Sequence, residues 1–373
     1  MDLLGWQMKV KIGTLTKIRT GKLDANASSE DGQYPFFTCS REALRISSYS
    51  YDCECVLVAG NGDLNVKYYN GKFDAYQRTY IIEDNSDGKL YMPYLYYFME
   101  GYIDELRKQA IGGVIKYIKL GNLTNALIEL PSMDKQKDVV NILEMLTGII
   151  DLRNDMILKL DELVKSRFVE LFGDPSTNPR GWMETTVGDE CFYIKDGPHK
   201  SLPDIGKENG GHPFISVRNI VNGYIDFSTA RYISDEDFAE AINKCNPEKG
   251  DMLYSKGGTT GIAKLIDIDE EFANWVHVAV LKFDKTKLNG IFFENMLNGA
   301  YCYEQSQRLT KGIANKDLVL SAIAKIKMYI PPIKLQNQFA DFVKQIDKSK
   351  LIVQKELDET QLLFDSLMQE YFG

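Results

Sequence analysis

The glycine-rich segment 255–264, SKGGTTGIAK, is the stretch of this chain whose residues best suit ligand chemistry. Backbone N–H groups beside its glycines, together with Lys256, Thr259 and Thr260, suit contacts to a phosphate backbone. A Walker-type nucleotide loop is excluded, because that loop needs Lys and Ser or Thr directly after its last glycine, where Ile262 stands. The residues leave two readings open, a phosphate contact or a plain hairpin turn.

Two stretches of the first half carry residues that could contact DNA. The segment 60–63, GNGD, is a shorter counterpart of the glycine-rich loop and contains Asn61. The segment 68–78 interleaves aromatic and basic residues and ends in Gln77 and Arg78. Arginine can bind guanine through two hydrogen bonds and glutamine can bind adenine, so both residues suit base contact. The alternative is that the tyrosines of this segment only pack against the rest of the fold.

Several further basic or amide residues complete the set of candidate DNA contacts. Position-matched lysines suit neutralisation of phosphates, although a solvated lysine is the commoner outcome. An arginine–asparagine pair also follows the strand-like run PFISV at 213–217. The remaining candidates are Lys22, Lys116, Arg218, Asn219, Lys311 and Lys316.

The histidines and cysteines do not predict a metal site. His277 lies in an apolar run and is interpreted as a hydrogen-bonded core histidine. The cysteines lack CxxC spacing and are expected to be reduced and buried as small apolar groups. They are Cys39, Cys53, Cys55, Cys191, Cys245 and Cys302.

Motifs typical of catalysis are missing from the chain. There is no GxSxG, no HExxH and no nuclease-like acidic cluster. The Asn/Asp-Pro-Pro-aromatic motif of amino-methyltransferases is also absent, since Ile330 precedes Pro331 and Pro332. The residues therefore favour a binding protein over an enzyme.

The elements that must position these residues are duplicated. A shift of 200 positions aligns Gly112 with Gly312 and keeps the register to Gly173 and Gly373, and the PFF run at 35–37 resembles PFI at 213–215 with a different offset. This spacing is too long for a solenoid unit of roughly 20–50 residues, so it indicates a duplicated half-molecule.

Each half ends in a segment that predicts a long helix. Residues 132–172 contain no proline, and the copy follows Pro331 and Pro332. Each helix of about forty residues would be roughly 60 Å long. Seven of nine seam positions at three- and four-residue steps are apolar in the first helix, which favours a two-helix coiled coil over core helices of one domain. Glu356 and Thr360 are expected to weaken the seam of the second helix.

The seam positions are the residues at those alternating steps. In the first helix they are Val139, Ile142, Leu146, Ile149, Arg153, Met156, Leu160, Leu163 and Arg167. In the second they are Phe339, Phe342, Ile346, Ser349, Val353, Glu356, Thr360, Leu363 and Leu367.

The globular parts predict an α+β fold. Strands are expected at 55–59, 79–82 and 276–283, and helices at 94–106 and 292–305. The expected organisation is a globular domain at 1–131, a helix at 132–174, a second globular domain at 175–332 and a helix at 333–373.

Charge and hydropathy limit the classes of partner. The net charge is −9, so DNA binding requires a local basic face rather than a basic domain. No run of eighteen apolar residues predicts a membrane span, and Met1–Trp6 lacks the pattern of a secretory leader. A cytoplasmic protein is expected.

The order and doubling of these segments resemble the specificity subunit of type I restriction–modification systems. In the first half the resemblance rests on Gln109–Gly113, Leu130-Pro131 and Phe168–Pro175. In the second half it rests on Thr310–Leu318, which includes Ile313 and Ala314, and on the run from Ile330 to Gln338.

The resemblance implies a DNA-reading scaffold without chemistry of its own. Two target recognition domains would each read half of a bipartite double-stranded target, and two antiparallel helices related by a pseudo-two-fold repeat would set the spacing. The helices would also dock two modification subunits that methylate adenine at N6 with S-adenosylmethionine. Restriction subunits using ATP and magnesium would join them, so no cofactor is expected in this chain.

Two other functional classes remain open from the sequence. A stand-alone DNA methyltransferase or nuclease of unusual motif would bind S-adenosylmethionine or nick DNA by itself. A coiled-coil adaptor between two proteins would show no salt-dependent DNA binding.

Overall fold

The chain forms two compact units in the computed structural model, which describes residues 9–312 and 316–373. Unit 1 comprises Met1–Met156 and Val353–Gly373, and unit 2 comprises Ile157–Ile352. Both units combine strands and helices, which confirms the mixed α/β composition expected from the sequence.

Two expectations lie outside the described residues: the absence of a leader at Met1–Trp6, and the family-like residues Ile313 and Ala314. Among the helices that the structure does describe, none has the length and apolar character needed to cross a membrane.

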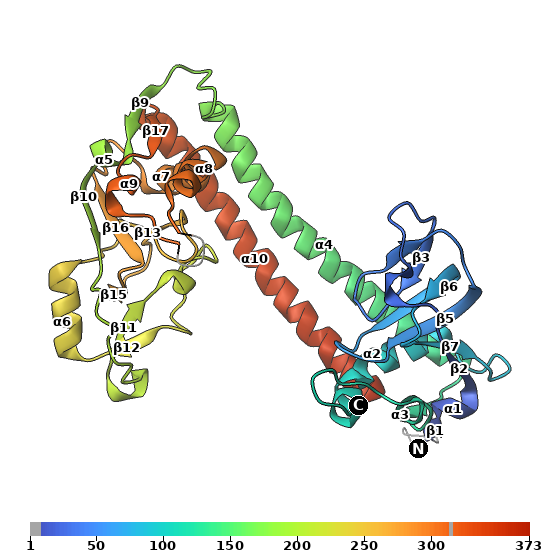
Figure 1. The fold of residues 1–373 in the computed structure, drawn as a ribbon. Helices are drawn as coiled ribbons and strands as arrows, with labels where there is room; N and C mark the ends of the chain where they lie inside the picture. Colours follow the sequence, from blue (N-terminus) through green and yellow to red (C-terminus); the bar gives the residue numbers. More distant parts are fainter. Residues whose placement is uncertain (1–8, 313–315) are drawn as a thin grey trace, which may run out of the picture. The chain divides into compact units, whose positions relative to one another are not determined.

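Unit 1 is built on a six-stranded sheet (Figure 1). Every neighbouring pair of strands is antiparallel except β3 and β6, which run parallel. Strand order across the sheet is β2 (Thr16–Thr20), β7 (Thr79–Asp84), β5 (Tyr51–Ala59), β6 (Val66–Ala75), β3 (Tyr34–Phe37) and β4 (Leu44–Ile46). The remaining elements are β1 (Lys9–Lys11) paired with β8 (Leu127–Glu129), the helices α1 (Ile12–Leu15), α2 (Met92–Gln109) and α3 (Leu120–Thr124), and the 3-10 turn η1 (Ala25–Ala27).

Strand β5 separates two apolar clusters because successive side chains point to opposite faces. Val56 and Val58 pack in the cluster that includes α2, whereas Cys55 and Leu57 pack in a second cluster around Phe73. All four residues are buried. The expected strands at 55–59 and 79–82 are therefore confirmed, with β5 extending further toward the N-terminus.

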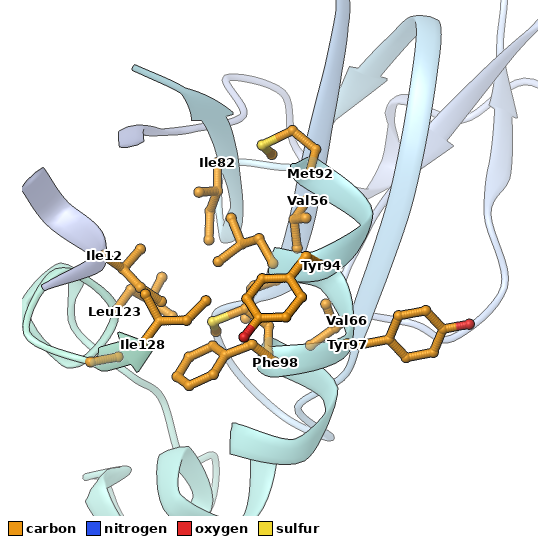
Figure 2. Packing of buried hydrophobic residues seen from close by; sticks show 14 of the residues in the cluster. Ile12, Val56, Val66, Ile82, Met92, Tyr94, Tyr97, Phe98, Leu123 and Ile128 are labelled. Atoms are coloured by element: carbon orange, nitrogen blue, oxygen red, sulfur yellow. The ribbon is translucent and has the colours of Figure 1, made fainter. Parts of the chain in front are cut away.

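The larger cluster of unit 1 joins the sheet to the surrounding short elements. Figure 2 shows side chains of the sheet (Val56, Ile82), of α2 (Tyr94, Phe98) and of α1, α3 and β8 directed toward one another. The last group comprises Ile12, Leu123 and Ile128. Complete burial of an aliphatic side chain contributes about 1.5–3 kcal/mol, so this cluster is a main source of the stability of unit 1.

Unit 2 divides its strands among three sheets. The four-stranded sheet has the order β10 (Cys191–Asp196), β16 (Val278–Phe283), β13 (Met252–Ser255) and β14 (Ala263–Leu265). The three-stranded sheet has β11 (His212–Ile215) between β12 (Arg231–Ile233) and β15 (Ala273–Asn274), and the pair is β17 (Lys327–Ile330) with β9 (Met183–Thr186). The helices are α5 (Val187–Glu190), α6 (Asp235–Lys244), α7 (Gly290–Asn298), α8 (Ala300–Leu309) and α9 (Leu320–Ile323), with 3-10 turns η2 (Lys207–Asn209) and η3 (Val217–Asn219).

Two sequence predictions for unit 2 were wrong in detail. The helix expected at 292–305 is broken at Gly299, whose extended backbone (ψ 150°) separates α7 from α8. The strand expected from Val276 begins at Val278, because the Val278 amide closes a turn onto the Trp275 carbonyl (2.9 Å).

Each half ends in a forty-residue helix, α4 (Met133–Phe172) or α10 (Ile333–Phe372). Within unit 1, Arg153 of α4 donates to the Glu356 carbonyl of α10 (2.6 Å) and to the Thr360 hydroxyl. Its guanidinium also forms an ion pair with the Glu356 carboxylate at 3.3 Å. The two residues expected to weaken the seam therefore bind the arginine opposite them.

Within unit 2, the two helices again run antiparallel. Lys350 of α10 pairs with Asp161 of α4 at 2.6 Å, and Phe168 packs on Phe339 with ring centres 5.4 Å apart.

The predicted seam of α4 is wrong at three positions. Ile142, Met156 and Leu163 are exposed. The neighbouring Leu143 is buried, and Ile157 and Val164 are partly buried. The buried side of α4 therefore continues from Val139 to Leu143, four residues on, rather than to Ile142, three residues on.

One buried glutamine in each unit ties a long helix to the globular part. Gln136 accepts a hydrogen bond from the Tyr91 amide (2.8 Å) and donates to the carbonyls of Lys89 (2.8 Å) and Pro131 (2.9 Å). Both glutamines are fully buried.

Gln336 repeats this arrangement in unit 2. It accepts from the Asn289 amide (2.8 Å) and donates to the carbonyls of Lys287 (3.2 Å) and Pro331 (2.7 Å). Asn289 caps α7, as Tyr91 caps α2, so the same bonds fix both junctions.

Candidate nucleic-acid interface

Four separate segments of unit 1 meet through backbone hydrogen bonds. The Gln77 amide donates to the Leu23 carbonyl (2.9 Å), and the Gly60 amide donates to the Arg78 carbonyl (2.8 Å). The Gly62 amide donates to the Lys116 carbonyl (3.0 Å). These bonds bring together the five candidates predicted in the first half, here named the unit 1 loop surface: Lys22, Asn61, Gln77, Arg78 and Lys116.

The side chains of the unit 1 loop surface are accessible. All are exposed except Asn61, which is partly buried. Gln77 donates to the Asp24 carboxylate at 2.8 Å. In the described part of the chain, Lys22, Arg78 and Lys116 have no side-chain hydrogen bond or ion pair, so their charges are available to an anion.

Unit 2 has the same scaffold with different residues. The Lys256 amide donates to the His277 carbonyl (2.8 Å) and the Gly258 amide donates to the Lys316 carbonyl (3.1 Å). Lys311 and Asp317 exchange both backbone bonds at 2.9 Å. The exposed residues predicted in this region, here named the unit 2 loop surface, are Thr259, Lys311 and Lys316.

The two predicted loop residues Lys256 and Thr260 do not belong to this surface. Lys256 is 6% exposed, and its ammonium forms ion pairs with Asp317 (3.2 Å) and Asp196 (3.5 Å). Thr260 is buried and shares a hydrogen bond with Thr310 (3.0 Å). Both residues hold the loop in place and are not exposed, and their role as DNA contacts stays a prediction.

Glycine is required in the loop for two different reasons. Gly258 has a positive φ of 71°, as does its counterpart Gly62 at 72°, a conformation that costs other residues about 1 kcal/mol. Gly257 lies against the imidazole of His277, where a Cβ atom would approach Nδ1 to 2.0 Å. The glycine-rich sequence thus reflects backbone geometry and a close contact.

His277 is partly buried, and its Nδ1 atom is buried without a hydrogen-bond partner among the described residues. Its ring packs edge-on against Trp275 with centres 5.0 Å apart. The interpretation as a hydrogen-bonded core histidine was therefore wrong for Nδ1.

The predicted pair Arg218 and Asn219 is divided between two roles. Asn219 is 1% exposed and serves the turn, and its role as a DNA contact stays a prediction. Its side chain accepts from the Ser216 amide (2.8 Å) and donates to the Asp226 carbonyl (2.8 Å). Arg218 is exposed on the turn that Asn219 clamps, and it donates to the Thr229 carbonyl (2.5 Å).

Arg218 lines a cavity of about 190 Å³ that sequence reasoning missed. The other lining residues are Phe214, Ser216, Arg231 and Trp275. The Arg231 guanidinium lies 5.7 Å from the centre of the Trp275 ring. The only local signal was the basic and aromatic character of these two residues, which are far apart in the chain.

Asp204 is a carboxylate whose pKa is affected by the charges of both arginines. Backbone amides of Tyr232 and Gly206 lower the pKa of Asp204, and the positive charges of Arg231 and Arg218 lower it further. The carboxylate accepts hydrogen bonds from Tyr232 N (3.0 Å) and Gly206 N (3.1 Å), which stabilise its ionised form.

The described cysteines and acidic residues offer neither a disulfide nor a candidate metal site. Burial raises the pKa of Cys245 to about 11 and of Cys302 to about 12, so both remain thiols at neutral pH. All six cysteines are free, and the described residues contain no group of three or more His, Cys, Asp or Glu that could hold a metal ion.

The chain matches one protein-family model twice, over residues 4–162 and 179–361. That model is described as the type I restriction modification DNA specificity domain.

Two curated relatives carry related names. The EcoDI type I restriction enzyme specificity subunit of Escherichia coli is 38% identical over 221 residues, which cover 57% of this chain and 49% of the relative. The match thus spans about half the length of that relative. The MjaVIII specificity subunit of Methanocaldococcus jannaschii is 22% identical over 95% of this chain and 89% of its own length.

Solved structures share the fold. An S subunit of a type I restriction–modification system from M. genitalium has a TM-score of 0.65 at 17% identity, covering 100% of this chain and 98% of that one. A chain from a study of complex assembly in the type I system has a TM-score of 0.58 at 15% identity, covering 100% and 99%.

Proposed function

The chain belongs to the family of type I restriction modification DNA specificity domains, and from this premise we propose that it recognises a bipartite target in double-stranded DNA. Unit 1 reads one half of the target through its loop surface, and unit 2 reads the other half. The reading domains correspond to residues 1–131 and 175–332.

One observation carries this proposal. The same backbone hydrogen bonds build the loop surfaces of both units, through Gly60 and Gly62 in one and Lys256 and Gly258 in the other. The side chains differ, because the turn that holds the exposed Gln77 and Arg78 in unit 1 holds the buried Val276 and the partly buried His277 in unit 2. A common scaffold with different side chains suits two half-sites of different sequence.

Lysines of the loop surfaces supply the sequence-independent part of binding. Lys116 and Lys316 occupy equivalent backbone positions and are both exposed. Neutralising phosphates with such lysines makes affinity fall steeply with salt concentration. A net charge of −9 is compatible with this because the contact is local.

The helices α4 and α10 act as a coiled-coil spacer in a pseudo-two-fold arrangement. Antiparallel contacts within each unit support this role, namely Arg153 with Glu356 in unit 1 and Asp161 with Lys350 in unit 2. A helix of forty residues is roughly 60 Å long, which corresponds to about 17 base pairs.

The chain works as a non-catalytic cytoplasmic subunit. The exposed faces of the helices dock two modification subunits, which supply adenine-N6 methylation with S-adenosylmethionine, and restriction subunits supply ATP- and magnesium-dependent cleavage.

Methylation sequencing tests the proposal. DNA from a host that expresses the full chain with the modification subunit of its system should carry methylated adenines in one split motif. Replacing residues 182–332 with those of a homologue should change only one half of that motif. Methylation without a split motif, or both halves unchanged after the replacement, would refute the proposal.

A further inference from the structure

The cavity beside Arg218 presents hydrogen-bond donors without matching acceptors. Arg231 is partly buried, and its guanidinium has no hydrogen bond or ion pair within residues 9–312 and 316–373. The indole Nε1 of Trp275 is buried and also lacks a partner there. Arg218 donates one N–H group to the Thr229 carbonyl, and within the described chain its remaining N–H groups are free to donate to a ligand. A ligand of this cavity must therefore offer acceptors.

The shape of the cavity limits that ligand to part of a molecule. Its volume of about 190 Å³ is below the roughly 300–1,000 Å³ of pockets that enclose small molecules. A whole nucleotide flipped out of a duplex does not fit, whereas the edge of a base within a duplex needs only a shallow, open recess.

Among base edges, guanine meets the demand for acceptors. Its N7 and O6 atoms lie side by side in the major groove and match the fork of an arginine. Adenine pairs its N7 acceptor with a donor, cytosine presents a donor, and thymine presents a single acceptor beside its methyl group. The aromatic wall formed by Trp275 and Phe214 also favours a flat ligand, and Arg231 already lies over the indole.

We propose that this recess, the arginine pocket (Phe214, Ser216, Arg218, Arg231 and Trp275), binds the major-groove edge of a guanine in the half-site read by unit 2. The inference rests on the proposed DNA-reading function and assigns one base class to one place in unit 2.

The scaffold holds the pocket rigid from two sides. Strand β11 pairs antiparallel with β12, which sets Arg231 opposite Phe214. On its other side β11 pairs parallel with β15, and the backbone amide of Trp275, which follows β15, donates to the Ile215 carbonyl (2.9 Å). The buried Asn219 holds the turn that carries Arg218 through bonds to Ser216 and Asp226. These contacts fix the backbone positions of both arginines, and a planar guanidinium loses less entropy per hydrogen bond formed than a flexible ammonium does.

Unit 1 has the same framework without the arginines. There Phe36 faces Leu44 across the two strands, and the Tyr76 amide donates to the Phe37 carbonyl (2.9 Å) as the Trp275 amide does to Ile215. Leu44 thus stands where unit 2 has Arg231. The guanine contact is accordingly assigned to the second half-site alone.

The test uses the full chain with its modification subunits and duplexes that carry the methylated motif or single-base substitutions of it. Arg231→Ala should reduce the preference for guanine at one position of the second half-site on the order of 10- to 100-fold, with the first half-site unchanged. Arg231→Lys should also lose preference, because an ammonium cannot form the paired bonds. Lys249→Ala serves as a control. Lys249 is also an exposed lysine of unit 2, but it lies at the end of β13 opposite to the unit 2 loop surface.

Three results separate the explanations. Unchanged preference in the second half-site for both Arg231 variants overturns the inference, while a split motif for the wild-type chain leaves the proposed function standing. Uniformly weaker binding that Arg231→Lys restores identifies a phosphate contact and also overturns it. If Arg231→Ala fails to fold, as thermal unfolding would reveal, Arg231→Lys and Arg218→Ala carry the same test.

Discussion

Replacing Gln336 with methionine is expected to weaken the junction between α10 and unit 2 by about 3 kcal/mol. The substitution keeps the side-chain volume nearly unchanged, so the cost comes from hydrogen bonds. Three bonds are lost, to the Asn289 amide and to the carbonyls of Lys287 and Pro331. Each leaves a backbone group without its partner at a fully buried position, which costs about 1 kcal/mol or more per group.

Hydrogen exchange under native conditions measures this loss where it occurs. Peptides covering 287–293 and the start of α10 should exchange about 100-fold faster in Gln336→Met, which corresponds to about 3 kcal/mol. Peptides covering 89–95 in unit 1 should be unchanged. Gln136→Met should give the reverse pattern, because Gln136 makes the equivalent bonds with Tyr91, Lys89 and Pro131.

Gln354→Met provides the matched control, since Gln354 lies on the exposed face of α10 and bonds only to Asp358. Its effect should stay within about 0.5 kcal/mol. The reasoning is refuted if Gln336→Met changes exchange no more than this control, or if it accelerates exchange equally at both junctions.

Four further outcomes follow from single contacts. Lys316→Ala should lower DNA affinity and reduce the slope of log affinity against log salt by about 0.9, as gel shifts at several salt concentrations would show. Gly62→Ala should cost about 1 kcal/mol in urea unfolding from its φ of 72° alone, because an added Cβ meets nothing within 4 Å. Arg153→Leu should cost about 2 kcal/mol through the lost bonds to Glu356, seen as faster exchange in both helices. Burial raises the pKa of Glu294, so its contribution to stability is complete below the usual glutamate pKa and falls as pH rises through the raised value. Glu294→Gln should remove that fall in urea midpoints measured between about pH 4 and 8.

These outcomes have distinct controls. Lys249→Ala should leave the salt slope unchanged, and Gly113→Ala, at a glycine of ordinary φ with open space around its Cβ, should cost less than Gly62→Ala. An equally steep pH dependence in Glu294→Gln would contradict the assigned origin of that dependence.

The long helices and the main strands were predictable because their signals are local. Residues 132–172 lack proline, and the run from Cys55 to Ala59 is continuously apolar. The break at Gly299 was missed although Asn298 and Gly299 are poor helix formers, because helical residues resume directly at Ala300. The phase of the α4 seam was missed because Ile142 and Leu143 are both apolar, and only contact with α10 and unit 1 decides which one faces inward.

The candidate site was predictable in residue type but not in accessibility. Backbone bonds among four segments bring the residues of the unit 1 loop surface together. In unit 2, however, Lys256, Thr260 and Asn219 are buried and make bonds within the fold. The sequence gives no sign of this, because ion pairs such as Lys256 with Asp317 form between distant residues. Arg231 and Trp275 meet only through β11, whose parallel partner β15 has two residues and no local signature.

The path of the reading loops rests on main-chain atoms, with Gly62 and Gly258 bonded to the carbonyls of Lys116 and Lys316. These bonds require glycine at 62 and 258, but they do not involve the exposed side chains of the loops. Point changes at Gln77, Arg78 or Thr259 can therefore accumulate without unfolding the loop. Under the proposed function, such changes alter which bases are recognised, while the contacts between α4 and α10 within each unit stay as they are.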